Sequence, residues 1–194
     1  MPFNIIDKLA QLEGIEKLPE ISPNTQDVPD EKSNTTSRLV QAVIPSVLAG
    51  FYKYTRDEKQ AVEIPVEKTG TDWTEILFGP EKTNLMKRIA IYSGASTTEA
   101  GEKMQQVSNN IINIIREDVT NADGKTIKNY FTAQRNDILH HLPAAIEIGN
   151  VLNDTTLDDR TNKMTGPVSG LMHGIEKTFA STDTEKNKDN KSKF

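Results

Sequence analysis

The stretch RLVQAVIPSVLAGFY, residues 38–52, decides the fold. Its apolar residues fall into two adjacent rows with a spacing of four, namely Leu39, Val43, Val47 and Phe51, and Val40, Ile44, Leu48 and Tyr52. Two adjacent rows make a stripe that is wider than a surface helix needs, and this predicts a helix buried on most of its circumference. The apolar run is too short, and too often interrupted by polar residues and proline, to predict a membrane span.

Helix start and stop signals outside this stretch predict more helices. Asp72 precedes Glu75 by three residues, and Ser96 precedes Glu99 by three, and each pair matches a capping box. Gly94 between them is a typical helix C-terminal cap. The helix that starts after Ser96 carries a core-facing stripe made of Ala100, Met104, Val107, Ile111 and Ile115.

Helical spacing returns in residues 127–142 and again in residues 167–179. Residues 64–70 are ambiguous, and a short strand there stays open. No hairpin signal accompanies it. We therefore expect an all-α fold, a multi-helical bundle of about seven or eight helices with helix-turn-helix-like junctions.

Composition divides the chain into four parts. Asn4 is a candidate cap for a short amphipathic helix, with Ile5, Leu9 and Leu12 on one side and Gly14 as its stop. Prolines recur among polar residues in the following segment, which is typical of a linker. We predict a short helix in 1–14, a flexible linker in 15–36, a helical domain in 37–180 and a disordered tail in 181–194.

Charge and cysteine content exclude several classes of site. The net charge is −5 with a pI near 5.3, so no overall basic field attracts nucleic acid or anionic lipid. The chain has no cysteine, which rules out disulfides and thiolate metal ligands. No signal peptide is visible, and a cytoplasmic location is the default expectation.

The stretch DILHHLPAAIEIG, residues 137–149, holds two of the three histidines. Adjacent helical residues point about 100° apart, so His140 and His141 do not converge on one metal. Asp137 lies one turn before His141, and the two side chains could pair. Asp137, His141 and His173 are the candidates for a polar site, whereas ordinary helix-surface histidines are the favoured interpretation. We assign no catalytic, cofactor-binding or metal-ligating residue.

Pro143 in the same stretch predicts a break in the helix near residues 139–142, because proline lacks the amide donor and clashes with the preceding turn. The residues Ile138, Leu142, Pro143 and Ile146 repeat the spacing of Val40, Ile44, Pro45 and Leu48. A duplicated helical unit or chance explains this similarity equally well.

Residues 89–104, IAIYSGASTTEAGEKM, fit the spacing of a helix-turn-helix. The recognition helix would carry Glu99, Glu102 and Lys103, and two glutamates against one lysine repel phosphates. Nucleic-acid binding is therefore disfavoured. Known signatures of hydrolases, phosphate-binding loops, dinucleotide sites and zinc proteases are missing, and we expect no cofactor. Trp73 is expected in the core.

Three segments together resemble a known family: WTEILFG in 73–79, IAIYSGASTTEAGEKMQQVSNNIINII in 89–115 and FTAQRNDILHHLPAAI in 131–146. In this order they resemble the bacterial YidB-like family, a domain of unknown function numbered 937. The Ser93–Ser96 junction, Gln134 and Leu142-Pro143 match motifs of that family, and VIPSVLAG, 43–50, is similar to its earlier apolar helix. The glycine-rich and leucine-rich runs of many members are missing here. The resemblance covers roughly 38–150 and implies a multi-helical fold without an established activity.

We expect a bacterial helical protein that acts as a non-enzymatic protein-binding or scaffolding module. Its partner would be another protein or a second copy of the chain, held in a helix groove, and the N-terminal helix would dock in cis or in trans. The alternatives are a small-ligand or metal-binding protein or enzyme with a pocket near His141, and a helix-turn-helix nucleic-acid binder.

Overall fold

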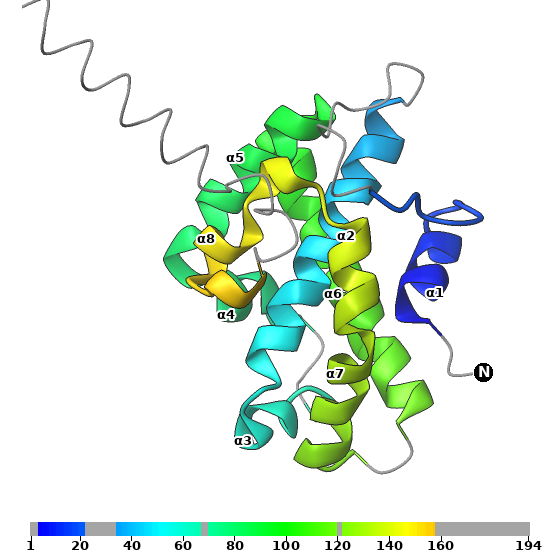
Figure 1. Cartoon of the computed structure of the whole chain (residues 1–194), viewed down its shortest axis with the longest axis vertical. Coiled ribbons are helices and arrows are strands. Elements are labelled where there is room, and N and C mark those ends of the chain that lie inside the picture. Colours follow the sequence, from blue (N-terminus) through cyan, green and yellow to red (C-terminus); the bar gives the residue numbers. More distant parts are fainter. Residues whose placement is uncertain (1–3, 22–33, 67–69, 120–121, 158–194) are drawn as a thin grey trace, which may run out of the picture. The chain divides into compact units, whose positions relative to one another are not determined.

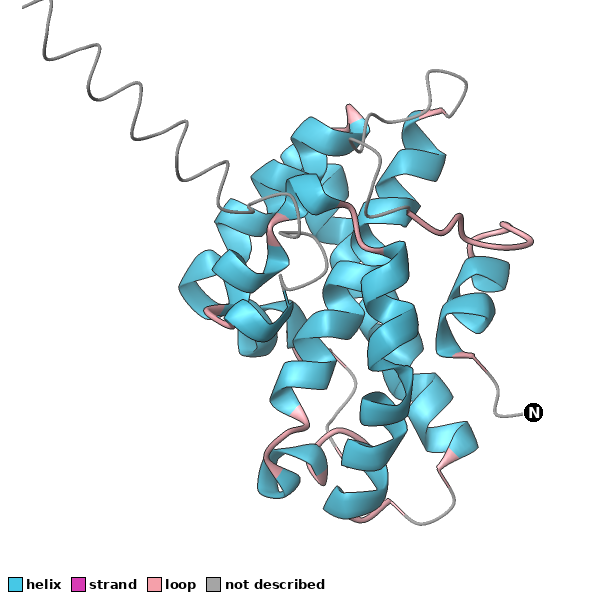
Figure 2. Cartoon of the chain, viewed as in Figure 1, coloured by secondary structure: helices cyan, strands magenta, loops and turns pink. Residues whose placement is uncertain are grey.

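The computed structural model describes residues 4–21, 34–66, 70–119 and 122–157, and all of these belong to one compact unit. Figures 1 and 2 show only helices and loops in this part of the chain. The α-helices are α1 (Ile5–Leu12), α2 (Thr35–Tyr54), α3 (Glu58–Ala61), α4 (Trp73–Phe78), α5 (Lys82–Ser93), α6 (Thr97–Asp118), α7 (Gly124–His141) and α8 (Ile148–Leu152), with 3-10 turns at Gly79–Glu81, Ala144–Ile146 and Thr155–Leu157. The expected all-α bundle is confirmed.

Helix α2 forms the centre of the bundle and packs against α5, α6 and α7 (Figure 1). Every residue from Leu39 to Phe51 is buried, including the small and polar ones between the two apolar rows. The wide stripe therefore predicted the burial of this helix correctly. Near its end, Phe51 stacks on Phe131 of α7 at 5.8 Å between ring centroids and contacts Trp73 of α4 at 5.4 Å. Trp73 is a core residue, as expected.

Pro45 lies inside α2 and does not end it. Proline in a helix interior removes one backbone hydrogen bond and costs about 3 kcal/mol. Ser46, the next residue, donates its hydroxyl to the Ala42 carbonyl at 2.7 Å, but the carbonyl that Pro45 leaves without its amide donor is that of Gln41, so this bond does not replace the lost one. Burial of residues 39–51 of α2 offsets the cost.

Pro143 acts differently, because α7 ends before it and Leu142 is extended, with φ −84° and ψ 121°. The predicted break is confirmed. The carbonyls at this helix end are bonded by distant groups: the Ile21 amide donates to the His140 carbonyl at 2.7 Å, and the Gln41 side chain donates to the His141 carbonyl at 2.6 Å. The two prolines therefore have opposite effects on their helices, although the spacing of aliphatic residues around them is similar.

Helix α1 docks on α2, α6 and α7. Asn4 caps it by accepting the Ile6 amide at 2.9 Å, as predicted. Ile5, Ile6, Leu9 and Ala10 are buried. Leu12 was expected on the same face, but its side chain is 60% exposed, and Ile6 and Ala10 complete the buried face instead.

The segment that follows α1 also packs against the bundle. Residues 15–21 belong to the predicted linker, yet Leu18 is only 1% exposed and the Pro19 carbonyl accepts a hydrogen bond from Gln41 at 3.2 Å. This part of the predicted linker therefore packs on the bundle through one buried leucine and two backbone contacts, which its polar composition did not indicate.

The junction between α5 and α6 has the expected helix-turn-helix-like form. Gly94 adopts the left-handed conformation at φ 78°, and Ser96 and Glu99 make the reciprocal capping box. Asp72 caps α4 by accepting the Glu75 amide at 3.1 Å, but Glu75 does not complete the box. Asp123 caps α7, and Gly124 is the first residue of this helix.

Residues 64–66, where a strand stayed open, form turns, and no strand occurs in the described ranges. The described helices also include none long and apolar enough to cross a membrane. The predicted helix in 167–179, the tail in 181–194 and His173 lie outside the described residues.

Candidate functional site

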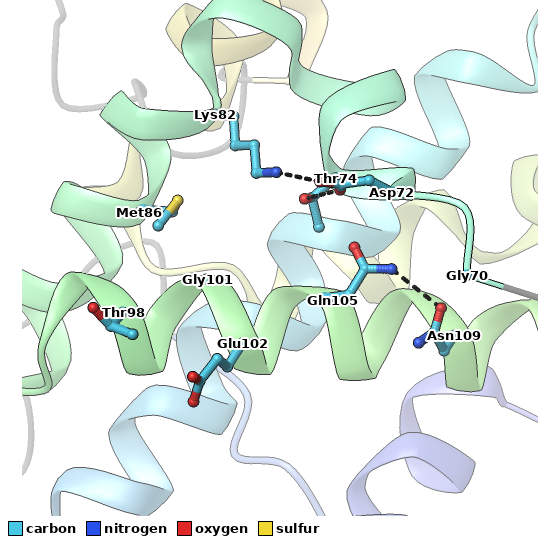
Figure 3. A pocket seen from close by; sticks show the side chains of 10 residues that line it. All are labelled: Gly70, Asp72, Thr74, Lys82, Met86, Thr98, Gly101, Glu102, Gln105 and Asn109. Atoms are coloured by element: carbon cyan, nitrogen blue, oxygen red, sulfur yellow. Dashed lines mark hydrogen bonds and ion pairs between the residues drawn. The ribbon is translucent and has the colours of Figure 1, made fainter.

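An open depression of the surface, called the cavity below, has a volume of about 610 Å³ and lies between α4, α5 and α6 (Figure 3). Ligand sites of proteins commonly measure 300–1,000 Å³, so its size suits a small molecule. One wall comes from the start of α4 and the loop before it, and a second from α5. The floor is one face of α6, because residues three, four or seven apart lie on the same side of a helix. The floor residues are Thr98, Gly101, Glu102, Gln105 and Asn109.

The first wall is built around the Asp72 carboxylate. Asp72 caps α4, accepts the Thr74 hydroxyl at 2.6 Å and pairs with the Lys82 ammonium of α5 at 2.7 Å. Burial alone would raise the pKa of Asp72, but the hydrogen bonds from Lys82, Thr74 and the Glu75 amide outweigh it and lower the pKa from 3.8 to about 2. Asp72 is therefore ionised at neutral pH and already bonded to the protein.

Lys82 is the only cationic side chain in the lining. It lies 2.7 Å from Asp72 and 3.6 Å from Glu75, so two carboxylates share one ammonium. Its side chain is 22% exposed. The ammonium charge is therefore balanced within the wall and has little attraction left for an anionic ligand.

Gly101 and Gln105 shape the floor of the cavity in different ways. A Cβ on Gly101 would lie 2.7 Å from the Met86 methyl group, so the missing side chain lets the α5 thioether lie close to α6. Gln105 donates its amide to the Thr71 carbonyl at 3.0 Å and to Asn109 at 3.3 Å. Its carbonyl oxygen is buried and has no hydrogen-bond partner in the described structure, so a polar acceptor lies unsatisfied beneath the cavity.

The sequence-predicted polar residues do not form this site. His141 is 5% exposed rather than on the helix surface, and its Nδ1 lies 2.7 Å from the Asp137 backbone carbonyl, not from the carboxylate. The Nδ1 atom must then carry the proton, because a carbonyl only accepts. Asp137 is exposed, and His173 lies outside the described residues.

The cavity was not predicted, although one signal existed. Residues 98, 101, 102, 105 and 109 form a polar stripe with helical spacing beside the apolar stripe of α6. Such a stripe usually marks a solvent-exposed face, so it does not indicate a pocket by itself. Only the packing of α4 and α5 over this face makes it a lining.

The one lysine of the candidate recognition helix already forms an ion pair within the protein. Lys103 of α6 pairs with Glu13 at 2.6 Å, and the Glu13 side chain is only 7% exposed. Within the described ranges, no cluster of three or more histidine or carboxylate side chains is arranged to hold a metal ion. No protein-family model matches the chain, and comparisons with curated proteins and with solved structures find no match.

Proposed function

We propose that this helical bundle is a non-enzymatic binding module whose site is the cavity between α4, α5 and α6. The observation that carries the proposal is the convergence of polar side chains from three helices around a volume of about 610 Å³. Carboxylates, amides and hydroxyls line it together with the apolar Met86 methyl group. This mixture suits recognition of a small polar molecule with an aliphatic part.

The state of Asp72 supports binding rather than acid–base chemistry. A general base works best with a pKa near the working pH, and Asp72, with a pKa of about 2, is far below neutral pH. Lys82 is balanced by two carboxylates. The lining groups are therefore arranged to orient a ligand.

The binding test uses Met86 and Met104 as a matched pair of probes. Met86 lines the cavity, whereas Met104 belongs to the buried stripe of α6 and is fully buried. A library of small cationic, neutral and anionic molecules is titrated into protein with ¹³C-labelled methionine methyl groups. We expect ligands that shift the Met86 resonance and leave Met104 unchanged.

Gly101→Leu supplies the control, because its side chain would fill the floor next to Met86. This variant should fold, as judged by far-ultraviolet circular dichroism, and should lose the ligand-dependent shifts. If no library member moves the Met86 resonance, or if Gly101→Leu binds as well as the parent chain, the cavity is not the site.

A protein partner is the second candidate, and the docking of α1 favours it. The groove formed by α2, α6 and α7 accepts an amphipathic helix, with Gln134 accepting the Ile5 amide at 2.8 Å and Asp118 pairing with Lys8 at 2.5 Å. An Ile6→Asp substitution should release α1 and let the groove bind a synthetic peptide of residues 1–21 in trans. Failure of the variant to bind this peptide would count against a groove that exchanges helices.

The remaining predictions from the sequence add context. The resemblance to the YidB-like family, a bacterial source and a cytoplasmic location stay predictions, and the binding proposal does not depend on them. For nucleic acid, the ion pair of Lys103 with Glu13 leaves the start of α6 with an acidic character.

A further inference from the structure

We infer that the cavity between α4, α5 and α6 selects a small aliphatic amine, bound as its ammonium cation. The inference rests on the proposed function and adds the chemical class of the ligand. It follows from which groups around the cavity are already bonded and which are left to meet a ligand (Figure 3).

The lining carries a negative charge. Asp72 and Glu102 contribute two carboxylates and Lys82 one ammonium, which gives −2 + 1 = −1. Glu75 adds a further carboxylate 3.6 Å from Lys82, just behind the wall. A cation therefore enters a favourable field, whereas an anion is repelled by at least one uncompensated charge.

The groups that would attract an anion are already bonded to other groups of the protein. Lys82 is shared by two carboxylates. The amide at the start of α4 is bonded by Asp72, at 3.1 Å from the Glu75 nitrogen. At the start of α6 the Ser96 hydroxyl and the Glu99 carboxylate satisfy each other's backbone amides. At each helix start the capping side chain therefore already occupies a backbone amide, which leaves fewer donors for a phosphate or carboxylate ligand.

The Glu102 carboxylate remains to meet a cation. In the described structure it makes no hydrogen bond or ion pair, and its side chain is exposed on the α6 side of the cavity. Thr98 lies one turn before it and offers a hydroxyl group. The Gln105 carbonyl oxygen is buried beneath the floor, so it adds negative potential but does not contact a ligand at the rim. An ammonium group has three donors and no acceptor, which matches these groups.

The aliphatic part of the ligand has a surface to contact. Met86 reaches across the cavity toward Gly101, and its thioether and methyl group are apolar and adaptable. A methylene chain packed on Met86 would place its ammonium group at the rim near Glu102. This combination distinguishes an aliphatic amine from an inorganic cation, which makes no use of an apolar wall.

Three probes with the same four-carbon chain separate the alternatives. Putrescine is a dication, butane-1,4-diol is neutral and succinate is a dianion. Each is titrated into the full chain while the Met86 methyl resonance is followed. We expect saturable shifts with putrescine that weaken as salt is added, and at least ten-fold weaker binding of the diol and of succinate.

Glu102→Gln and Glu117→Gln are matched variants, because both remove one carboxylate from an exposed position of α6 and only Glu102 lines the cavity. Glu102→Gln should weaken putrescine binding by about three- to ten-fold, and Glu117→Gln should leave it within about two-fold. Equal binding of the diol or succinate, or equal effects of the two variants, would overturn the amine assignment while leaving a binding cavity. Absence of any shift across all three probes and the wider library would overturn both.

Discussion

Replacement of two helical glycines by alanine should change stability in opposite directions. Alanine is favoured over glycine in a helix interior by about 1 kcal/mol, so helix propensity alone predicts a gain at Gly101 of α6 and a smaller gain at Gly124 of α7. The tertiary surroundings of the two residues differ. The structure therefore predicts that one substitution stabilises the bundle and the other destabilises it.

At Gly124 the added Cβ would collide with backbone. It would lie 2.8 Å from the Glu58 carbonyl carbon and closer still to the carbonyl oxygen, where α3 packs against the start of α7. Backbone cannot rotate away, so α3 or α7 must shift. Overpacking of this kind costs about 1–3 kcal/mol. We expect Gly124→Ala to lower the free energy of unfolding by about 2 kcal/mol, which lowers the melting temperature by about 4–8 °C.

At Gly101 the nearest atom is the Met86 methyl carbon at 2.7 Å, the far end of a flexible side chain. Met86 can change rotamer at little cost, so the propensity gain should remain. Gly101→Ala should raise the free energy of unfolding by up to about 1 kcal/mol, or about 2–4 °C.

Thermal and urea unfolding followed by circular dichroism at 222 nm measure both variants against the parent chain. A Gly124→Ala protein that melts at or above the parent temperature would refute the close approach of α3 to α7. A Gly101→Ala protein that loses 1 kcal/mol or more would show that Met86 is fixed.

Three further outcomes are expected. The pKa of Asp72 is lowered from 3.8 to about 2, so its contribution to stability is fully present above pH 3.8 and is lost as the pH falls through 2. The Asp72→Asn variant keeps the cap, and the difference in its free energy of unfolding from the parent chain, measured in urea, should shrink between pH 5 and pH 2. A constant difference would contradict the assignment. Lys103→Met leaves the buried Glu13 carboxylate unpaired and should lower the free energy of unfolding by about 2–3 kcal/mol. A second change, Glu13→Gln, should restore much of this loss in a double-mutant cycle. Additive effects of the two changes would argue against the ion pair. Phe131→Ala should cost about 3–5 kcal/mol, while Leu12→Ala, at a 60% exposed position, should change stability by less than about 0.5 kcal/mol; similar losses at both positions would contradict the burial described above.

Local signals predicted most of the helices and their ends. Ser96 with Glu99, and Gly94 before them, bond only to backbone groups within a few residues, so the sequence alone contains the interaction. The two apolar rows of α2 similarly predicted its burial, because helical spacing fixes which side chains share a face.

The candidate site could not be predicted in the same way. Asp72 and Lys82 are ten residues apart, and Gln105 joins them only because α4 and α5 pack over α6. The histidines drew attention because of their chemistry, but His141 is buried against its own helix. A polar stripe becomes a pocket lining only when another element covers it, and no local pattern records that covering.

The two prolines show which features of a helix the sequence determines and which depend on tertiary packing. By sequence, Pro45 and Pro143 follow the same aliphatic spacing and share the same missing amide donor, and a break was predicted only at Pro143. In the fold, α2 is surrounded by three helices whose packing offsets the lost bond, so it continues through Pro45. The end of α7 is bonded by the Ile21 amide and the Gln41 side chain, so it stops at Pro143. Tertiary partners decide because the free energy of a helix break depends on what satisfies and buries the freed backbone groups.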